Sequence, residues 1–160
     1  MSFSLSEEGR AELDRLLSRY PDRAAAILPA LHLVQGEFGY VPDEAIPYIA
    51  GLVGRSPADV EGVATFYTLF ERRPMGKHHL QICRNLSCSL MGAEALIDHV
   101  SARLGIRPGE TTPDGKFTLS VVECLGSCGT APVMQVGDEY HENLTVEAVD
   151  ALLLRLRSEE

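Results

Sequence analysis

The residues of this sequence best suited to chemistry are its four cysteines, which form two close pairs in the second half of the chain. Four residues separate Cys83 from Cys88, three separate Cys124 from Cys128, and 35 lie between the pairs. The first eight residues lack the basic region and apolar core of a signal peptide, so we expect the protein to stay in the cytosol or on the cytosolic side of a membrane. Because thiols are kept reduced there, we expect the cysteines to act as metal ligands or redox groups and not as structural disulfides.

The spacing within the pairs leaves two kinds of metal site open. Structural zinc accepts four thiolates, and its ligands are often two to four residues apart. An iron–sulfur cluster also accepts four thiolates, and Cys-x4-Cys begins the ligand run of plant-type ferredoxins, although the second pair departs from that run. Disulfides within the pairs would close short rings and restrict the unfolded chain little. A reversible dithiol is disfavoured because neither pair has the Cys-x-x-Cys spacing of the thioredoxin active site.

The residues around the cysteines favour the iron–sulfur cluster. The second loop, Cys124–Pro132, is rich in small residues, and we expect Gly126 and Gly129 to adopt positive φ and to point backbone N–H groups at sulfur. Such hydrogen bonds stabilise the added electron of a cluster. An apolar lid that limits the access of water is expected from four residues: Leu86, Leu90, Met91 and Leu125. No Cys-x-His pattern occurs, so His78 and His79 are expected to be strand or surface residues and not ligands of a Rieske-type centre.

The second half of the sequence alternates between strand and helix signals. Strands are expected at His79–Cys83, Phe117–Val122, Pro132–Val136 and around Tyr140, and helices over Ala93–Leu104 and from Thr145 to about Arg157. This pattern predicts a layered α/β arrangement. Each cysteine pair begins where a strand gives way to a loop. Two loops at the same end of neighbouring strands would bring the four sulfurs together.

The first half of the sequence carries helix signals. Apolar residues recur at helical spacing in four stretches, which lie within Leu13–Tyr20, Ile27–Phe38, Ile46–Val53 and Ser56–Tyr67. Ser4 and Glu7 match a capping box for the first helix. Gly39 and Gly54 are suited to end the second and third helices, and Ser56 is suited to cap the fourth. We therefore expect a helical bundle.

A polar segment broken by proline and glycine, Glu71–Lys77, is predicted to link two domains. We expect an N-terminal helical domain over residues 1–75 and a second domain over residues 76–160. The fold class is then α+β, or α/β for the second domain taken alone.

The composition argues against several partners and chemistries. The formal net charge is −9, from 14 basic and 23 acidic residues, so nucleic acid is not an expected partner. No stretch approaches the roughly 20 apolar residues of a membrane-spanning helix. We find no glycine-rich dinucleotide fingerprint and no nucleophile or general base, so no catalytic residue is assigned.

These motifs together resemble the thioredoxin-like [2Fe–2S] ferredoxin family. The resemblance rests on Cys83–Cys88 and Val122–Pro132 and extends upstream through Leu33–Tyr40, Gly62–Tyr67 and Pro74-x-Gly76-Lys77, so it covers nearly the whole chain. Within this family the sequence looks most like the small [2Fe–2S] subunits of bacterial NADH–quinone oxidoreductase, which is respiratory complex I. Related subunits occur in NAD-reducing hydrogenases and NAD-dependent formate dehydrogenases, and the sequence does not separate these assemblies well.

The resemblance implies a helical N-terminal region followed by a thioredoxin-like [2Fe–2S] domain. It implies that Cys83, Cys88, Cys124 and Cys128 bind one [2Fe–2S] cluster, which carries electrons one at a time. FMN and NADH are then expected on a partner flavoprotein, with other peripheral-arm subunits of the complex as further partners. The chain would act as a subunit of an oxidoreductase without an active site of its own. It would sit on the cytoplasmic face of the inner membrane as part of the complex.

Overall fold

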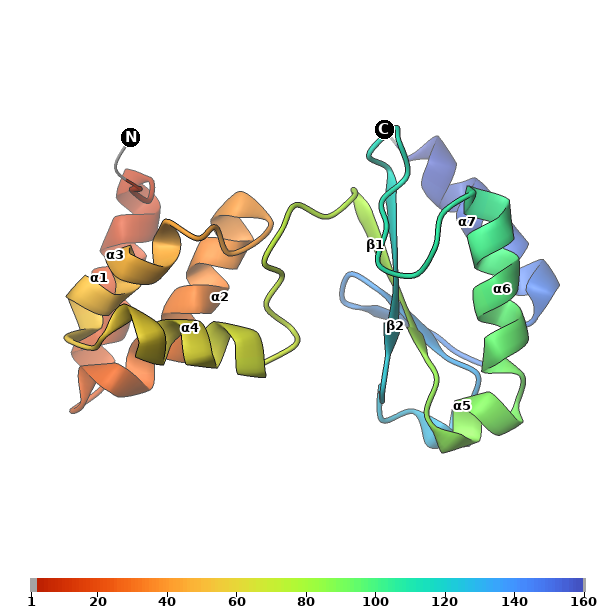
Figure 1. Ribbon diagram of the computed structural model, residues 1–160, viewed down its shortest axis with the longest axis horizontal. Helices are drawn as coiled ribbons and strands as arrows, with labels where there is room; N and C mark the ends of the chain where they lie inside the picture. Colours follow the sequence, from red (N-terminus) through yellow and green to blue (C-terminus); the bar gives the residue numbers. More distant parts are fainter. Residues whose placement is uncertain (1–2, 160) are drawn as a thin grey trace. The chain divides into compact units, whose positions relative to one another are not determined.

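The computed structural model describes residues 3–159 of the chain and has the expected α+β composition (Figure 1). It divides into two compact units, the first ending at Pro74 and the second beginning at Met75. Among the residues described, the first unit contains helices and no strand, and the second contains a four-stranded sheet with helices. Within the described residues, no helix is long and apolar enough to span a membrane.

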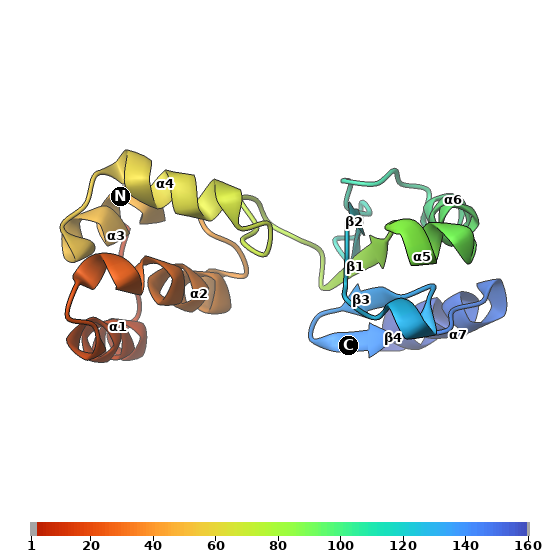
Figure 2. The ribbon, with the colours of Figure 1, turned by 90° about the horizontal axis from the view of Figure 1, so that it is seen from below.

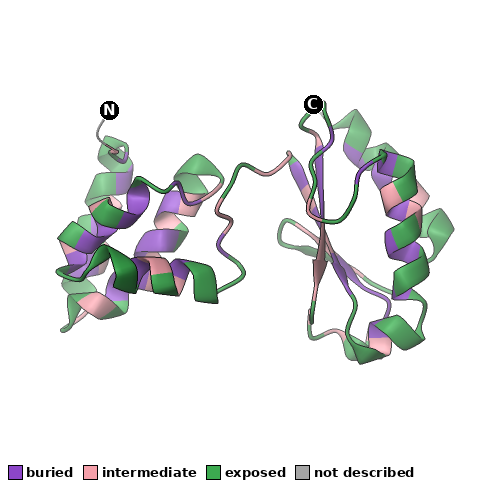
Figure 3. Cartoon of the chain, viewed as in Figure 1, coloured by how far each residue is buried: buried purple, intermediate pink, exposed green. Residues whose placement is uncertain are grey.

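The first unit is built by packing the apolar stripes of its helices against one another. Its helices are α1 (Glu7–Arg19), the short 3-10 helix η1 (Arg23–Ala26), α2 (Ile27–Phe38), α3 (Ala45–Val53) and α4 (Pro57–Phe66). Figure 2 shows α1 beside α2, and α3 beside α4, as their contacts require. Each helix contributes buried side chains, among them Leu13, Leu31, Ile49 and Val60. Figure 3 shows these buried stripes facing into the bundle and exposed residues facing outward. The predicted periodicity is therefore confirmed.

The ends of these helices follow the predicted signals, with one exception. Gly39 and Gly54 adopt the left-handed conformation that ends α2 and α3, and Ser56 forms a capping box at the start of α4. The capping box expected from Ser4 is wrong, because Ser6 is the N-cap of α1 and its Oγ accepts from the Gly9 N–H at 3.0 Å. Glu37, 31 residues away in the sequence, holds Ser6 at this N-cap position.

Glu37 lies at the end of α2. Its carboxylate accepts from the Ser6 backbone N–H at 2.7 Å and from the Ser6 hydroxyl at 3.1 Å. No local pattern in the sequence reports this contact.

The second unit is a mixed sheet covered by two helices. Its elements are β1 (His78–Cys83), α5 (Leu86–Leu90), α6 (Ala93–Leu104), β2 (Phe117–Val122), the 3-10 helix η2 (Cys128–Thr130), β3 (Met134–Val136), β4 (Glu139–His141) and α7 (Val146–Ser158). The strand order is β2-β1-β3-β4, with β1 parallel to β2 and the other pairs antiparallel. Figure 1 shows α6 and α7 on the same side of the sheet. Leu80, Ile82 and Leu119 of the strands share a buried core with Val100 of α6 and Val149 of α7.

Two details of this unit differ from the sequence prediction. The third strand begins at Met134 and not at Pro132, which follows a cis peptide bond with Ala131. Helix α5 was not expected, because five residues are too few to show a helical period.

An acid-sensitive contact joins α6 to α7. The Asp150 carboxylate lies 2.9 Å from His99 Nε2 and 2.9 Å from Arg103 Nε. The hydrogen bond with His99, followed by the charge of Arg103, lowers the pKa of Asp150 below its usual 3.8. A carboxylate whose pKa is lowered by folding stabilises the folded state above its unfolded pKa, and this contribution is lost as the pH falls through the folded pKa.

We therefore expect Asp150→Asn to lower the thermal unfolding midpoint at neutral pH, and the difference from the wild type to shrink below about pH 4. Circular dichroism melts over this range measure both effects. Asp98→Asn, at an exposed carboxylate of α6, is the control. A difference between Asp150→Asn and the wild type that does not change with pH would contradict the assignment.

Candidate metal centre

The parallel pairing of β1 and β2 places both cysteine pairs at one edge of the sheet. Cys83 is the last residue of β1 and lies opposite Val122, the last residue of β2, so the loops after both strands leave the sheet together. Cys88 lies in α5, which follows β1, and Cys124 lies two residues beyond β2. Cys128 begins η2, and η2 contacts α5 (Figure 1). The structure thus brings the two predicted loops together.

The four sulfurs differ in their surroundings. Cys83 and Cys88 are buried, Cys124 and Cys128 are exposed, and all four thiols are free. Burial, a hydrogen bond with Cys83 and the nearby sulfurs of Cys83 and Cys128 raise the pKa of Cys88, against a smaller opposing effect of the Val133 backbone. Because metal binds thiolate and not thiol, binding here must release protons.

The donors present suit a group that takes four thiolates. The sulfurs of Cys83 and Cys128 lie near that of Cys88, and Cys124 lies in the same loop as Cys128. Within residues 3–159, however, no three Cys, His, Asp or Glu side chains are already arranged to hold a metal ion.

One of the two glycines that were expected to direct a backbone N–H at a cysteine sulfur does so. Gly126 has a φ of +76°, and its N–H donates to Cys124 Sγ at 3.3 Å. Such a φ is strained for other residues, so glycine is required for this contact. Gly129 does not adopt the expected positive φ, because it lies within η2.

Three of the four residues expected to form an apolar lid do not do so, because their side chains are exposed. Leu86, Leu90 and Met91 are 70%, 78% and 63% exposed. The reason is helical geometry: Leu86 and Leu90 lie two residues before and after Cys88, which places them on the side of α5 opposite to the buried thiol. Only Leu125 of the four packs against the buried cysteines.

The cover of Cys83 and Cys88 is instead made by small residues and by valines in or next to the strands. The buried cluster contains both cysteines with Ala93, Ala131 and Val133, and half-buried Val122 and Leu125 pack against it. This cover excludes water from one side of the site and leaves the other side open.

The histidines lie away from the cysteines along the strand, as expected. His78 and His79 begin β1, whereas Cys83 ends it. His79 Nε2 is 2.7 Å from Ser120 Oγ, and the ring of His78 packs against Phe117 at 5.5 Å between centroids.

Contacts that the sequence did not predict join the second cysteine loop to β4 and to the residue directly after it. The Tyr140 hydroxyl donates to the Leu125 carbonyl at 2.8 Å. Glu142 Oε1 accepts from the hydroxyls of Ser127 and Thr130, the latter at 2.6 Å. These partners are 12 to 15 residues apart, so no spacing rule would have found them.

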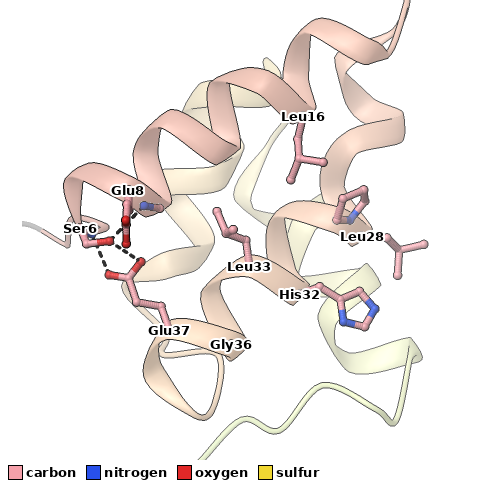
Figure 4. A pocket seen from close by; sticks show the side chains of 10 residues that line it. Ser6, Glu8, Leu16, Leu28, His32, Leu33, Gly36 and Glu37 are labelled. Carbon is pink, nitrogen blue, oxygen red and sulfur yellow. Dashed lines mark hydrogen bonds between the residues drawn. The ribbon is translucent and has the colours of Figure 1, made fainter.

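The first unit has a hollow of about 850 Å³ between α1 and α2 (Figure 4). Apolar side chains, including Leu16, Leu28 and Leu33, line it, and Glu8 and Glu37 lie at one end. The residues that line it include no cysteine.

Comparison with known proteins gives one consistent result. The family model for thioredoxin-like [2Fe-2S] ferredoxins matches residues 13–157. The E 2 subunit of NADH-quinone oxidoreductase from Rhizobium meliloti is 53% identical over 151 residues, which cover 94% of this chain and 90% of that protein. NADH-quinone oxidoreductase subunit 2 of Thermus thermophilus is 52% identical over 149 residues, which cover 91% of this chain and 82% of that protein.

A solved structure supports the fold alone. The chain in an NAD+-reducing [NiFe]-hydrogenase, in its H2-reduced state, aligns with a TM-score of 0.75 and 22% identity. The alignment covers 86% of this chain and 23% of that one.

Proposed function

This chain belongs to the thioredoxin-like [2Fe–2S] ferredoxin family, and from that premise we propose that it is the electron-transfer subunit of an NADH–quinone oxidoreductase. The observation that carries the proposal is the meeting of two cysteine loops at one sheet edge, in a chain that matches such subunits over more than nine-tenths of its length. NADH and FMN belong to a partner flavoprotein. The chain contributes to the oxidoreductase without an active site of its own.

In this proposal Cys83, Cys88, Cys124 and Cys128 hold the single cluster as four thiolates. When bound, a [2Fe–2S] cluster accepts and releases one electron at a time, which allows the two electrons of a reduced flavin to be separated. The four free thiols and their two converging loops support this ligand set.

The residues around the ligands divide the site into a closed and an open side. Buried Cys83 and Cys88 lie under the apolar cover and away from water. The Gly126 N–H stabilises negative charge on Cys124 Sγ. Because electron transfer requires close approach, we place the partner on the open side, where Cys124 and Cys128 are exposed.

Exposed apolar side chains support a docking face at this open side. Leu86, Leu90 and Met91 surround the outer face of α5, and α5 contacts the η2 turn that carries Cys128. Exposed apolar groups gathered beside a functional site are typical of a protein–protein interface.

The alternative assembly is an NAD-reducing hydrogenase or an NAD-dependent formate dehydrogenase. The fold likeness to a chain of an NAD+-reducing hydrogenase is consistent with it, and the curated relatives favour the quinone oxidoreductase. Affinity purification of the native assembly tests this choice. Peripheral-arm subunits and attachment to the cytoplasmic face of the membrane support the quinone oxidoreductase, whereas a hydrogenase subunit would overturn it.

The first unit is proposed to supply a second part of the docking surface. The hollow between α1 and α2 combines an apolar lining with Glu8 and Glu37 at its end. We expect a chain without residues 1–75 to retain its cluster but to bind the flavoprotein at least about tenfold more weakly, because this surface is lost. Binding titrations with the purified flavoprotein, together with iron assays, measure both properties. Undiminished binding by the shortened chain would refute this role.

A further inference from the structure

The segment of residues 140–144, which comprises the end of β4 and the chain directly after it, holds the loop that carries Cys124 and Cys128. Its backbone contributes two hydrogen bonds: the Asn143 N–H donates to the Thr130 carbonyl at 2.7 Å, and the Leu144 N–H donates to the Pro132 carbonyl at 3.1 Å. Its side chains add the Tyr140–Leu125 hydrogen bond and the contacts of Glu142. The segment thus holds the loop at points along its whole length.

Glu142 makes contacts on both sides of one ligand, Cys128. Its Oε1 accepts from Ser127 Oγ, which precedes Cys128 directly, and from Thr130 Oγ1, two residues after it. The two hydroxyl oxygens lie 2.8 Å apart, so the three oxygens form one compact group. The hydrogen bonds from Ser127 and then Thr130 lower the pKa of Glu142, which keeps the carboxylate ionised at neutral pH.

Resting on the proposed function, we propose that Glu142 is a positioning residue for the cluster: it fixes Cys128 by holding the hydroxyls on both sides of it, and its negative charge lowers the reduction potential. Holding both neighbours of Cys128 restricts the loop before a cluster binds, which reduces the ordering cost of binding. A fixed negative charge close to the cluster disfavours the addition of an electron.

Three variants of the full chain, each loaded with cluster, separate these effects. Glu142→Ala removes both the acceptor and the charge, whereas Glu142→Gln keeps an oxygen acceptor and removes the charge. Glu139→Gln is the matched control, because it removes the same charge from exposed β4 without a contact to the loop. The measurements are the rate of cluster loss to an iron chelator and the midpoint potential from an EPR-monitored titration.

We expect Glu142→Ala to lose its cluster about tenfold faster than the wild type, since a charge-assisted pair of hydrogen bonds is lost. Its midpoint potential should shift to a more positive value. Glu142→Gln should show the shift in potential with a smaller gain in the rate of loss. Glu139→Gln should resemble the wild type in both measurements.

Each contrary outcome overturns a defined statement. If Glu142→Ala matches Glu139→Gln in rate and potential, the proposal is wrong. If only the rate of cluster loss changes, Glu142 holds the loop in place, and the statement that it lowers the reduction potential is wrong. If Glu142→Ala does not fold, Ser127→Ala with Thr130→Val tests this holding role, and a rate of loss equal to that of the wild type overturns it. A wild-type chain that binds no cluster refutes the proposed function itself, which distinguishes that failure from a failure of this inference.

Discussion

Serine in place of Cys83 or Cys124 is expected to leave the protein with little cluster and with a less stable second unit. A hydroxyl is a far weaker metal ligand than a thiolate, and cluster binding contributes to the folding free energy of the site. Iron and sulfide assays, visible absorption and thermal melts measure these losses.

The two substitutions should differ in the cluster-free protein. Cys83 is 3% exposed, so Cys83→Ser buries a hydroxyl among Ala93, Ala131 and Val133 and should cost about 1–3 kcal/mol by itself. Cys124 is exposed, so Cys124→Ser should change the stability of the cluster-free protein little. Ser89→Ala, at an exposed position of α5, is the control. Full iron and sulfide with an unchanged spectrum in either cysteine variant would show that the ligand assignment is wrong.

The double substitution Leu86→Asp with Leu90→Asp is expected to weaken binding to the flavoprotein by about a hundredfold or more, while the cluster is retained. Both side chains are mostly exposed on the outer side of α5, so the charges are accommodated in the free chain. In a complex they would replace buried apolar contacts with carboxylates that have lost their water. Binding titrations against the purified flavoprotein measure the effect, and absorbance reports the cluster.

Leu154→Asp provides the matched control for this prediction. Leu154 is 64% exposed on α7, so it tests the same kind of substitution, made once instead of twice, at another place on the second unit. Equal affinities of the double variant and the control would show that α5 is not part of the docking face.

Much of the fold could be predicted because local signals and tertiary packing agree. The residues that end α2 and α3, Gly39 and Gly54, and the capping box at Ser56 mark boundaries that the structure reproduces. Strands β1 and β2 contain residues with high β-propensity and lie next to the cysteine loops as expected.

The errors arose where a distant contact or a short helix decides the structure. Ser6 and not Ser4 caps α1 because Glu37, 31 residues away, binds it. Helix α5 turns Leu86 and Leu90 outward because Cys88 faces the core. The contacts of Tyr140 and Glu142 depend on the β3–β4 hairpin, which returns the chain to the cysteine loop.

The most direct test of the central claim is an anaerobic EPR spectrum of the purified chain after dithionite reduction, with iron, acid-labile sulfide and zinc assayed on the same sample. We expect about two irons and two sulfides per chain, with a spin-one-half signal that appears on reduction. Zinc without sulfide, and no signal on reduction, would show that the four thiols form a structural zinc site and would contradict the role in electron transfer.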